Sequence, residues 1–577
     1  MRLPDPPFVL LDDARADGAP ARLYRNPVEI VAADDPGGVP DALARLREAR
    51  ARGLHAAGYL GYGATGAPLW FGLFRDYAEI ASADVPLLLP DPAGAWAGAP
   101  EPQIDSAAYA SAFAKVAAYI EAGDIYQANL TFRASVRYAG GEAALYALLR
   151  SRARAGCSAL VATGARWVLS LSPELFFALE GGRLRARPMK GTAVREADPA
   201  ADRAAAEGLA ADPKQRAENL MIVDLMRNDL SRVARPGSVA VPQLFHVEHY
   251  PTVHQLVSVV TADLREGCDA IDAITALFPC GSVTGAPKIR AMQVIEQVEH
   301  APRGLYTGSI GRLDANGDAR FNVAIRTLDC DGAGRATLGL GSGVVADSEA
   351  IPEWEECLAK GAFVTAGERP FDLIETMRFD PDQGIALLER HLARIRESAA
   401  ALGFRFDRHD ARNALQAATF RLRDPARVRL LLAPSGALAI GIAPLPPTPA
   451  APVAVALVPH SVAPDDFRLR HKTSRRCFYD LARARAGTWE VAFVDAEGFV
   501  NEGSFTSLFV ERDGVLVTPP LRRGLLPGVL RAELLATGRA VEGDLRPGDL
   551  AHGFFVGNAL RGLVAAVTVA ERADADV

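Results

Sequence analysis

The segment Glu218-Asn-Leu-Met-Ile-Val-Asp-Leu-Met-Arg-Asn-Asp-Leu230 places a carboxylate among apolar residues that recur at helical spacing. Glu218, Ile222 and Leu225 fall on one face of a helix, because side chains three or four positions apart lie above one another. A carboxylate on an apolar face needs a polar partner, since an unpaired charge is costly to bury. The segment therefore predicts a helix that carries Glu218 toward other charged groups.

Upstream of this segment, the sequence predicts a helix followed by a strand. Asp105 and Ser106 can cap the start of the helix, and Gly123 can end it. The apolar residues between them recur at helical spacing: Tyr109, Phe113, Val116 and Ile120. From residue 129 to residue 136 apolar and polar residues alternate, which predicts a strand with one buried and one exposed face.

Turn-rich segments divide the chain into domains, as expected for 577 residues, a length that exceeds one hydrophobic core. The segment Leu89–Pro100, rich in proline and glycine, closes an N-terminal region at 1–100. A second domain is predicted at 101–366. Turn residues at Ala366–Pro370 mark the main break in the chain.

The last part of the chain, residues 371–577, is predicted to have two lobes. Five prolines lie between residues 444 and 452, and such a segment acts as a stiff connector. The lobes are therefore expected at about 371–443 and about 453–577.

The composition excludes several classes of protein. A net charge of −7 and a pI near 5.9 give no general attraction to nucleic acid. No apolar run reaches the roughly 20 residues of a membrane span, and the N-terminus lacks the pattern of a signal peptide. The six cysteines lack the short paired spacings of a disulfide or zinc framework, which suits a reducing compartment. We therefore expect a cytoplasmic protein that acts on small molecules, with no nucleic-acid or membrane partner.

Lysine is rare in this chain, with only six among 63 basic residues, so the surroundings of each lysine are informative. A lysine amine can lose its proton and attack carbon, whereas an arginine stays charged. Glu356 and Lys360 lie four residues apart and could present an acid and an amine to one pocket. From spacing alone, an ordinary surface ion pair is the favoured interpretation. Lys190 and Lys472 also lie in distinctive motifs, whereas Lys115 has no motif and is expected to be structural.

Seven motifs between residues 105 and 365 together resemble the chorismate-binding enzymes. They follow one another along the chain: Gly123–Leu130, Ser172–Glu174, Arg187–Thr192, Glu218–Leu230, Phe278–Lys288, Arg303–Gly311 and Gly341–Asp347. The resemblance implies an α+β fold of the anthranilate synthase component I type, with a β-sandwich-like core and helices. Lys190 is similar to the lysine of aminodeoxychorismate synthase component I, where anthranilate synthases carry a small residue.

The resemblance also implies roles for individual residues. Chorismate is a dicarboxylate with an allylic hydroxyl, so its site needs a divalent cation, cationic donors and acid–base groups. Lys190 would attack the ring covalently and expel the hydroxyl before ammonia displaces the enzyme, with Glu174 as general acid/base. Glu218 and Glu356 would hold Mg²⁺. The residues expected to contact the substrate are Lys360, Arg326, Tyr306, Gly343 and His254. For the histidine, a hydrogen-bonded core residue is an equally good interpretation.

The source of ammonia is expected to lie outside the motifs described so far. Glutaminases that feed such enzymes carry a cysteine nucleophile on a glycine-flanked elbow, and neither Cys157 nor Cys280 stands in that pattern. The resemblance therefore implies a separate glutamine amidotransferase subunit or the use of free ammonia.

The C-terminal part resembles the fold-type IV pyridoxal-phosphate enzymes. The resemblance rests on four segments: Leu388–Arg394, His471–Ser474, Asn501–Ser504 and Leu525–Arg531. Aminodeoxychorismate lyases, which are close relatives of branched-chain aminotransferases, fit best. Stand-alone lyases have additional residues before the segment that corresponds to Phe371–Met377, and the substrate contacts made by those residues are not expected here.

Each matched residue of this part has an expected role toward pyridoxal 5'-phosphate. Lys472 would carry the cofactor and move protons, and Glu502 would keep the ring nitrogen charged. Arg394 would pair with the phosphate, which the free amides of Gly528 and Val529 would also bind at the start of a helix. Asn558 is a further candidate for the cofactor pocket.

The two parts together predict two consecutive reactions. The first would convert chorismate and ammonia to 4-amino-4-deoxychorismate, and the second would eliminate pyruvate to give 4-aminobenzoate, a folate precursor. One alternative is an anthranilate- or isochorismate-type synthase fused to a branched-chain-type aminotransferase. Another is a C-terminal module that is not catalytic.

Overall fold

The computed structural model describes residues 3–62, 69–249, 253–449 and 452–569. The chain divides into two units that are discontinuous in sequence. The first unit comprises 1–89, 99–136 and 146–366, and the second comprises 90–98, 137–145 and 367–577. None of the described helices is long and apolar enough to cross a membrane.

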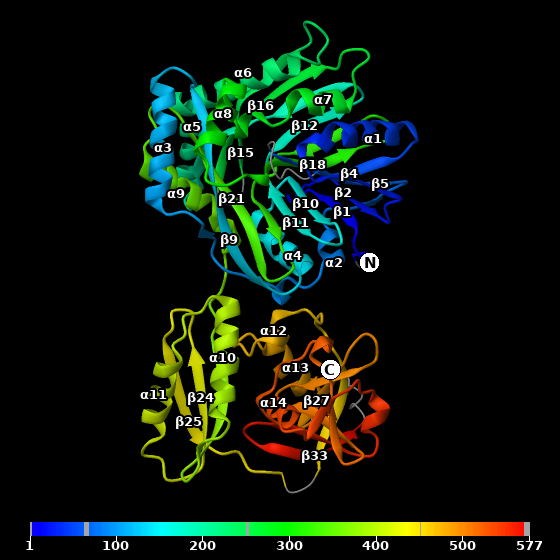
Figure 1. Ribbon diagram of the computed structural model, residues 1–577, viewed down its shortest axis with the longest axis vertical. Helices are drawn as coiled ribbons and strands as arrows, with labels where there is room; N and C mark the ends of the chain where they lie inside the picture. Colours follow the sequence, from blue (N-terminus) through cyan, green and yellow to red (C-terminus); the bar gives the residue numbers. More distant parts are fainter. Residues whose placement is uncertain (1–2, 63–68, 250–252, 450–451, 570–577) are drawn as a thin grey trace. The chain divides into compact units, whose positions relative to one another are not determined.

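The first unit is built on two large sheets (Figure 1). The first sheet has the strand order β17-β9-β21-β20-β11-β10-β1-β2-β6, with β8 pairing β9 outside this path. Its strands are β1 (Phe8–Asp12), β2 (Ala21–Arg25), β6 (Ala78–Ile80), β8 (Glu101–Pro102), β9 (Gln127–Ala139), β10 (Cys157–Ala162), β11 (Trp167–Ser172), β17 (Gly285–Ala286), β20 (Thr327–Cys330) and β21 (Arg335–Val344).

The second sheet of this unit has the order β14-β16-β13-β12-β19-β18-β4-β5-β3, with β15 pairing β16. Its strands are β3 (Glu29–Ala33), β4 (His55–Tyr62), β5 (Leu69–Phe74), β12 (Leu175–Glu180), β13 (Arg183–Arg187), β14 (Met189–Val194), β15 (Ala240–His249), β16 (Val253–Asp263), β18 (Gly304–Leu313) and β19 (Ala319–Asn322).

The two sheets share a hydrophobic core. Val9 and Tyr24 from the first sheet pack with Tyr59 and Trp70 from the second, and all four are buried. Sheets that pack face to face in this way form a sandwich. The predicted α+β class with a β-sandwich-like core is therefore confirmed.

Helices cover the remaining faces of these sheets. They are α1 (Val39–Ala51), α2 (Val85–Leu88), α3 (Ser106–Glu121), α4 (Glu142–Ala153), α5 (Pro199–Ala211), α6 (Pro213–Ser231), α7 (Ala270–Leu277), α8 (Lys288–Val298) and α9 (Ala350–Gly361). Helices α1, α6 and α7 share one core with strands of the second sheet, while α9 packs on β21 and on α3.

The predicted helix around Glu218 is α6, and its boundaries have simple causes. Asp212 caps its start by accepting a hydrogen bond from Gln215 N at 2.9 Å, and a proline occupies the first turn. Ile222 is fully buried in the core under the second sheet, whereas Glu218 is half-buried. The helix therefore places this carboxylate at the margin of its apolar stripe.

The predicted strand at 129–136 lies within β9, but its exposure differs from the prediction. Asn129 and Thr131, expected on an exposed face, are both 7% exposed. Glu299 and Arg303 cover this face: Thr131 N donates to Glu299 Oε1 at 2.9 Å, and Arg303 donates to Asn129 O. Asn129 and Thr131 are buried because a charged pair from a distant segment satisfies the backbone there, whereas Arg133 and Ser135 further along are partly exposed, as predicted.

The second unit contains a four-stranded sheet with the order β23-β22-β24-β25. Its strands are β22 (Leu373–Asp380), β23 (Gly384–Ile385), β24 (Ala426–Leu432) and β25 (Leu438–Pro444). Helices α10 (Leu388–Leu402) and α11 (Arg408–Thr419) pack against this sheet (Figure 1). Their buried residues Leu392 and Leu415 contribute to one core with Val428 and Leu430 of β24.

A larger sheet follows, with the order β28-β27-β26-β33-β32-β29-β30-β31. Its strands are β26 (Val453–Pro459), β27 (Glu490–Val494), β28 (Val500–Gly503), β29 (Ser507–Arg512), β30 (Val515–Thr518), β31 (Ala540–Glu542), β32 (Phe554–Asn558) and β33 (Gly562–Val569), and its helices are α12 (Phe467–Arg470), α13 (Cys477–Ala486) and α14 (Val529–Ala536). The turn between β29 and β30 is Asp513-Gly514, where both residues have positive φ, as a two-residue hairpin requires.

Candidate active sites

Glu174 lies just before β12 in the interior of the first unit, where it is 5% exposed. Ser282 Oγ donates a hydrogen bond to Glu174 Oε1 at 2.7 Å. Burial raises the pKa of Glu174 to about 7, although Ser282 and the positive charge of Lys190 act in the opposite direction. A carboxyl group with such a pKa can hold or release a proton near neutral pH. The sequence did not single out Ser282, although it lies within the motif Phe278–Lys288.

Lys190 lies on β14 beside an irregularity that changes the direction of its side chain. The register of β14 against β16 shifts between Met189 and Thr192, and Gly191 has a φ of +104° that favours glycine. A Cβ atom added to Gly343 of β21 would lie 2.6 Å from Lys190 Nζ. The amine therefore lies against Gly343, as expected if both belong to one site.

Gln127 of β9 borders the same position, with its Nε2 atom 2.8 Å from a Cβ added to Gly343. Its side chain is fully buried, and within the described part of the chain neither amide atom has a hydrogen-bond partner. An unsatisfied buried amide costs about 1–3 kcal/mol, which suggests that a ligand satisfies it. The sequence analysis gave no role to Gln127, although it lies in the motif Gly123–Leu130.

Helices α6 and α9 bring further charged groups to Lys190. Lys360 Nζ lies 2.6 Å from Glu356 Oε1 and donates to Gly341 O at 2.9 Å. Neighbouring protein atoms would raise the pKa of Glu356 by desolvation, although its side chain is 53% exposed, but the charge and hydrogen bond of Lys360 hold the pKa below its usual value. Burial raises the pKa of Glu218, and Glu356 adds to this effect, while Lys190 opposes it. Four of the predicted residues therefore share one electrostatic environment.

The residues predicted to hold Mg²⁺ fit a divalent cation. Glu353, one turn before Glu356, has a buried Oε2 atom with no hydrogen-bond partner among the described residues. Over the same residues, no group of three or more His, Cys, Asp or Glu side chains could hold a metal by itself. Mg²⁺ keeps several waters and commonly binds only one or two carboxylates together with substrate oxygens. Glu218 and Glu356 suit that mode of binding.

Two other predicted contacts are Tyr306, on β18 of the second sheet, and Arg326, directly before β20 of the first sheet. The ring of Tyr306 packs on Gly339 of β21, and burial raises the pKa of its hydroxyl, which remains a donor. Arg326 has a φ of +48°, and its carbonyl accepts from Leu171 N at 3.0 Å. Their contacts with a substrate stay predictions.

The remaining predicted contact, His254, is fully buried on β16 with protein partners on both ring nitrogens. Its Nε2 atom lies 3.0 Å from Asp202 Oδ1, and its Nδ1 atom lies 2.7 Å from His249 Nδ1. These hydrogen bonds account for its burial without a ligand, as the alternative interpretation of this residue expects. A role toward substrate stays a prediction.

The second unit contains a cavity of about 350 Å³ whose wall includes Lys472. The main chain of this lysine is held by β22, because Ile374 N donates to Lys472 O at 2.8 Å. Burial lowers the pKa of Lys472 to about 7, and the charges of Arg394, Arg476 and Arg429 lower it further, against Glu375. A partly neutral amine at this place can react with an aldehyde.

Glu502 of β28 lines the same cavity and is 4% exposed. Tyr479 donates its hydroxyl hydrogen to Glu502 Oε1, and Leu526 N donates to Oε2 at 3.0 Å. Burial raises the pKa of Glu502 to about 7 in spite of these hydrogen bonds. A protonated ring nitrogen placed beside this carboxylate would stabilise its charged form.

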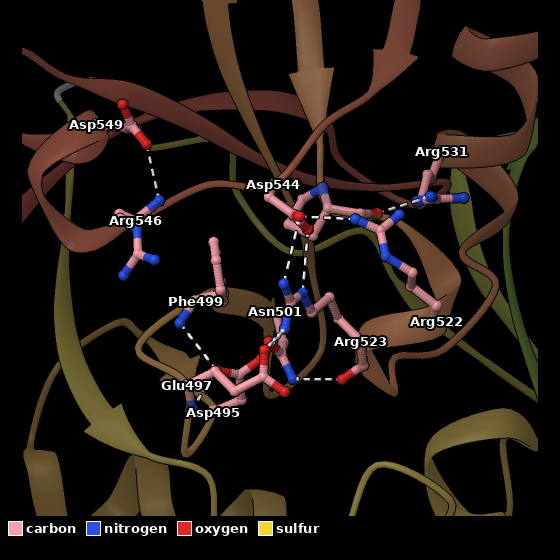
Figure 2. A network of polar contacts seen from close by, with 11 residues as sticks. Asp495, Glu497, Phe499, Asn501, Arg522, Arg523, Arg531, Asp544, Arg546 and Asp549 are labelled. Carbon is pink, nitrogen blue, oxygen red and sulfur yellow. Dashed lines mark hydrogen bonds and ion pairs between the residues drawn. The ribbon is translucent and has the colours of Figure 1, made fainter.

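A polar network around Arg523 includes Asn501, the residue before Glu502 (Figure 2). Asn501 Nδ2 donates to Arg523 O at 2.8 Å, and Arg523 Nε donates to Asp544 Oδ1 at 3.0 Å. The guanidinium of Arg523 also lies 3.7 Å from the ring centre of Phe499. The network therefore joins the loop before α14 to β28, the strand that carries Glu502.

Arg394 of α10 has an unpredicted protein partner in the cavity wall. Its Nε and Nη2 atoms donate to the two oxygens of Glu375 at 2.8 and 2.6 Å, and His391 Nδ1 lies 2.6 Å from the same carboxylate. Nη1 donates to Pro527 O at 3.1 Å. A guanidinium has five N–H donors, so Arg394 retains donors for a phosphate.

The start of α14 fits a phosphate as well. Gly528 caps this helix without a side-chain hydrogen bond, so the first amides, including that of Val529, are free. A Cβ added to Gly528 would lie 2.5 Å from Ser507 Oγ. Ser507, Gly528 and Val529 all line the cavity. Asn558 also lines the cavity, but its Oδ1 atom accepts hydrogen bonds from its own turn.

Comparison with known families assigns a family model to each part of the chain. Residues 75–366 match the family model described as chorismate binding enzyme, and residues 372–569 match amino-transferase class IV. The chain therefore belongs to the chorismate binding enzyme family and continues into an amino-transferase class IV domain.

Two curated proteins are similar in sequence to part of the first unit. The aminodeoxychorismate synthase component 1 of Klebsiella aerogenes is 47% identical over 252 residues, which are 44% of this chain and 56% of that protein. The Escherichia coli K12 protein of the same name is 45% identical over 252 residues, which are 44% and 55% of the two chains. The match thus spans little more than half the length of these curated relatives.

A solved structure also resembles the first unit. Anthranilate synthase component I from Streptococcus pneumoniae TIGR4 superposes with a TM-score of 0.52 at 26% identity, over 60% of this chain and 92% of that chain.

Proposed function

We propose that the first unit aminates chorismate to 4-amino-4-deoxychorismate and that the second unit converts this product to 4-aminobenzoate and pyruvate. The observation that carries the proposal is a pair of lysines, Lys190 and Lys472, each in a separate site with a buried carboxyl group whose pKa is raised to about 7. Relatives of the first unit carry the name aminodeoxychorismate synthase, which supports the choice of the first reaction.

In the first reaction, Lys190 Nζ attacks the ring carbon and the ring hydroxyl departs. Glu174 donates the proton that this hydroxyl needs to leave as water. Ammonia then bonds to the carbon that carried the hydroxyl, and the bond to Lys190 breaks with return of the amine. The burial that raises the pKa of Glu174 to about 7 leaves it partly protonated at neutral pH, so that it can give a proton to the leaving hydroxyl.

Other residues of the first unit bind and orient the substrate. Lys360, fixed by Glu356 and by the carbonyl of Gly341, places a positive charge near Lys190 for a carboxylate. Glu218 and Glu356 would hold Mg²⁺, which would neutralise the carboxylate on the ring. Gly343 leaves the space that the amine of Lys190 occupies.

Ammonia is proposed to come from a separate glutamine amidotransferase or from solution. Burial raises the pKa of Cys157, and it raises the pKa of Cys280 to about 12. A buried thiol of high pKa is a poor nucleophile, so neither cysteine suits a glutaminase site.

In the second reaction, the residues of the class IV domain hold the cofactor and move protons. Pyridoxal 5'-phosphate would supply the electron-withdrawing ring that acidifies the hydrogen next to the substrate amine. Lys472 Nζ takes this proton, the bond to the enolpyruvyl oxygen breaks, and the enol becomes pyruvate after it gains a proton. Glu502 would keep the cofactor's ring nitrogen in its charged form, while Arg394 and the amides at the start of α14 would hold its phosphate.

A second candidate is an anthranilate- or isochorismate-type synthase joined to a branched-chain-type aminotransferase. The class IV match and the anthranilate synthase structure are compatible with it. Lys190 argues against it, because the proposed covalent step needs an amine at this position.

The experiment is product analysis of the purified protein, supplied with chorismate, ammonium, Mg²⁺ and pyridoxal phosphate. We expect 4-aminobenzoate and pyruvate in equal amounts, together with visible absorbance that borohydride bleaches. Anthranilate as the product would refute the first assignment. A protein that stays colourless after cofactor addition would refute the second and favour a C-terminal module without catalysis.

A further inference from the structure

The cavity of the second unit carries more positive charge than the cofactor needs. Seven arginines line it, against two carboxylates from Asp480 and Glu502. Each guanidinium stays charged at any pH that a protein meets. The excess charge is unfavourable in a partly buried pocket unless anions occupy it.

Protein groups satisfy only some of these arginines. Arg394 pairs with Glu375, Arg468 pairs with Asp466 at 2.6 Å, and Arg476 donates to a backbone carbonyl. In the described ranges of the chain, Arg427, Arg429 and Arg561 form no ion pair. Arg483 reaches Asp480 only at 3.7 Å.

Three of the arginines without a close acid come from different elements, and two of them lie beside one aromatic ring. Arg427 is on β24, Arg483 is on α13, and Arg561 is in the turn after β32. The guanidinium carbons of Arg483 and Arg561 lie 4.9 and 5.4 Å from the ring centre of Phe505, and Arg561 lies 5.7 Å from that of Trp489. The two rings hold the flat guanidinium groups in place.

The pKa of Arg561 reflects the charged side chains around it. Burial lowers its pKa, and the charges of Arg427 and Arg483 lower it further, while the charge of Glu490 acts in the opposite direction. Its Nε atom is buried and has no hydrogen-bond partner in the described part of the protein. Asn558 fixes the backbone here by accepting from Arg561 N at 3.0 Å. Donors that are held in place without a partner form a site for an anion.

This group of arginines is separate in the fold from the groups suited to phosphate. The phosphate candidates are Arg394 on α10 and the free amides at the start of α14. The three arginines belong to neither helix. With Arg394 and these amides available for the cofactor phosphate, the three arginines are available for a second anion in the same cavity.

Building on the proposed function, we infer that Arg427, Arg483 and Arg561 bind one carboxylate of a dicarboxylate substrate in the class IV site. The other carboxylate would lie in the remainder of the pocket. Arg429 lines that pocket too, and its charge helps to lower the pKa of Lys472. A branched-chain amino acid has one carboxylate and an apolar side chain, which these arginines would not accept. The trio thus selects a doubly negative substrate over a monocarboxylate.

The first test is steady-state kinetics of the holoenzyme with 4-amino-4-deoxychorismate supplied directly. Arg427→Gln and Arg561→Gln are each expected to raise KM about ten- to hundredfold, the range for a charge-assisted hydrogen bond, with kcat and the cofactor absorbance little changed. Arg561→Lys should recover part of the loss. The control is Arg412→Gln, an exposed arginine of α11 that pairs with Glu389 at 2.6 Å. An unchanged KM in both glutamine variants, or a fall in kcat alone, would overturn the inference.

The second test counts bound chorismate by calorimetry with Mg²⁺ and without ammonia. Chorismate is a dicarboxylate without the amine, so the class IV site can bind it but not convert it. We expect two binding events in the unsubstituted protein and one in Arg561→Gln. A single event in the unsubstituted protein would refute the arginine site. This count is obtained even if no 4-aminobenzoate forms, so it separates failure of the inference from failure of the proposed reaction.

Discussion

Removal of the Ser282 hydroxyl should shift the pH dependence of the first reaction. Ser282 donates to Glu174 at 2.7 Å and thereby stabilises the charged carboxylate, which lowers its pKa against the effect of burial. In Ser282→Ala the charged form loses a hydrogen bond worth about 1.5–3 kcal/mol. One pKa unit corresponds to about 1.4 kcal/mol, so the pKa of Glu174 should rise by about one to two units.

The direction of the effect follows from the role of Glu174 as proton donor. The protonated form is active, so the rate falls as the pH rises through the pKa of about 7. A higher pKa in Ser282→Ala moves this alkaline limb upward by about one to two pH units.

The assay is the initial rate of amination of chorismate between pH 6 and about 9, at a constant concentration of unprotonated ammonia. Ser282→Thr keeps the hydroxyl and is the matched control, for which the limb should stay in place. If the limb of Ser282→Ala coincides with that of the unsubstituted protein, Glu174 is not the titrating proton donor.

Other substitutions test the two sites and the fold around them. Lys190→Ala should abolish amination while chorismate still binds, which product analysis and calorimetry can measure; retained turnover would exclude the covalent step. Gln127→Leu should slow amination about tenfold or more, with little loss of stability because the amide has no protein partner among the described residues; an unchanged rate would show that no ligand uses this amide. Lys472→Ala should leave no borohydride-reducible absorbance, and a persistent absorbance would locate the cofactor bond elsewhere. Lys288→Met should lower the unfolding free energy by about 3–5 kcal/mol, because Lys288 Nζ pairs with the buried Asp229 at 2.9 Å; Lys115→Met, on an exposed part of α3, is the control in thermal unfolding.

The elements that the sequence predicts well are those with local causes. Helix α6 follows from a capping aspartate, a proline in the first turn and a regular apolar stripe, all within one segment. Helix α3 follows from the same logic, since Asp105 Oδ1 accepts from Ala108 N at 2.8 Å. These features are local, so a single sequence is enough to find them.

The contacts that the sequence does not predict join distant segments. Burial of Asn129 depends on Arg303, 174 residues further along the chain. The pairing of Arg394 with Glu375 depends on how α10 packs on β22. Alternation and motif spacing carry no information about such partners, so a phosphate was the only partner expected for Arg394.

A substitution at Gly343 would shift the amine of Lys190 without replacing Lys190 itself. The atoms that an added methyl group would meet there are the ends of two flexible side chains, those of Lys190 and Gln127, rather than backbone. An alanine at this site would be absorbed by small rotations of those side chains, while the sheet kept its geometry. Engineers could therefore use residue 343 to change how the nucleophile approaches the ring, separately from folding.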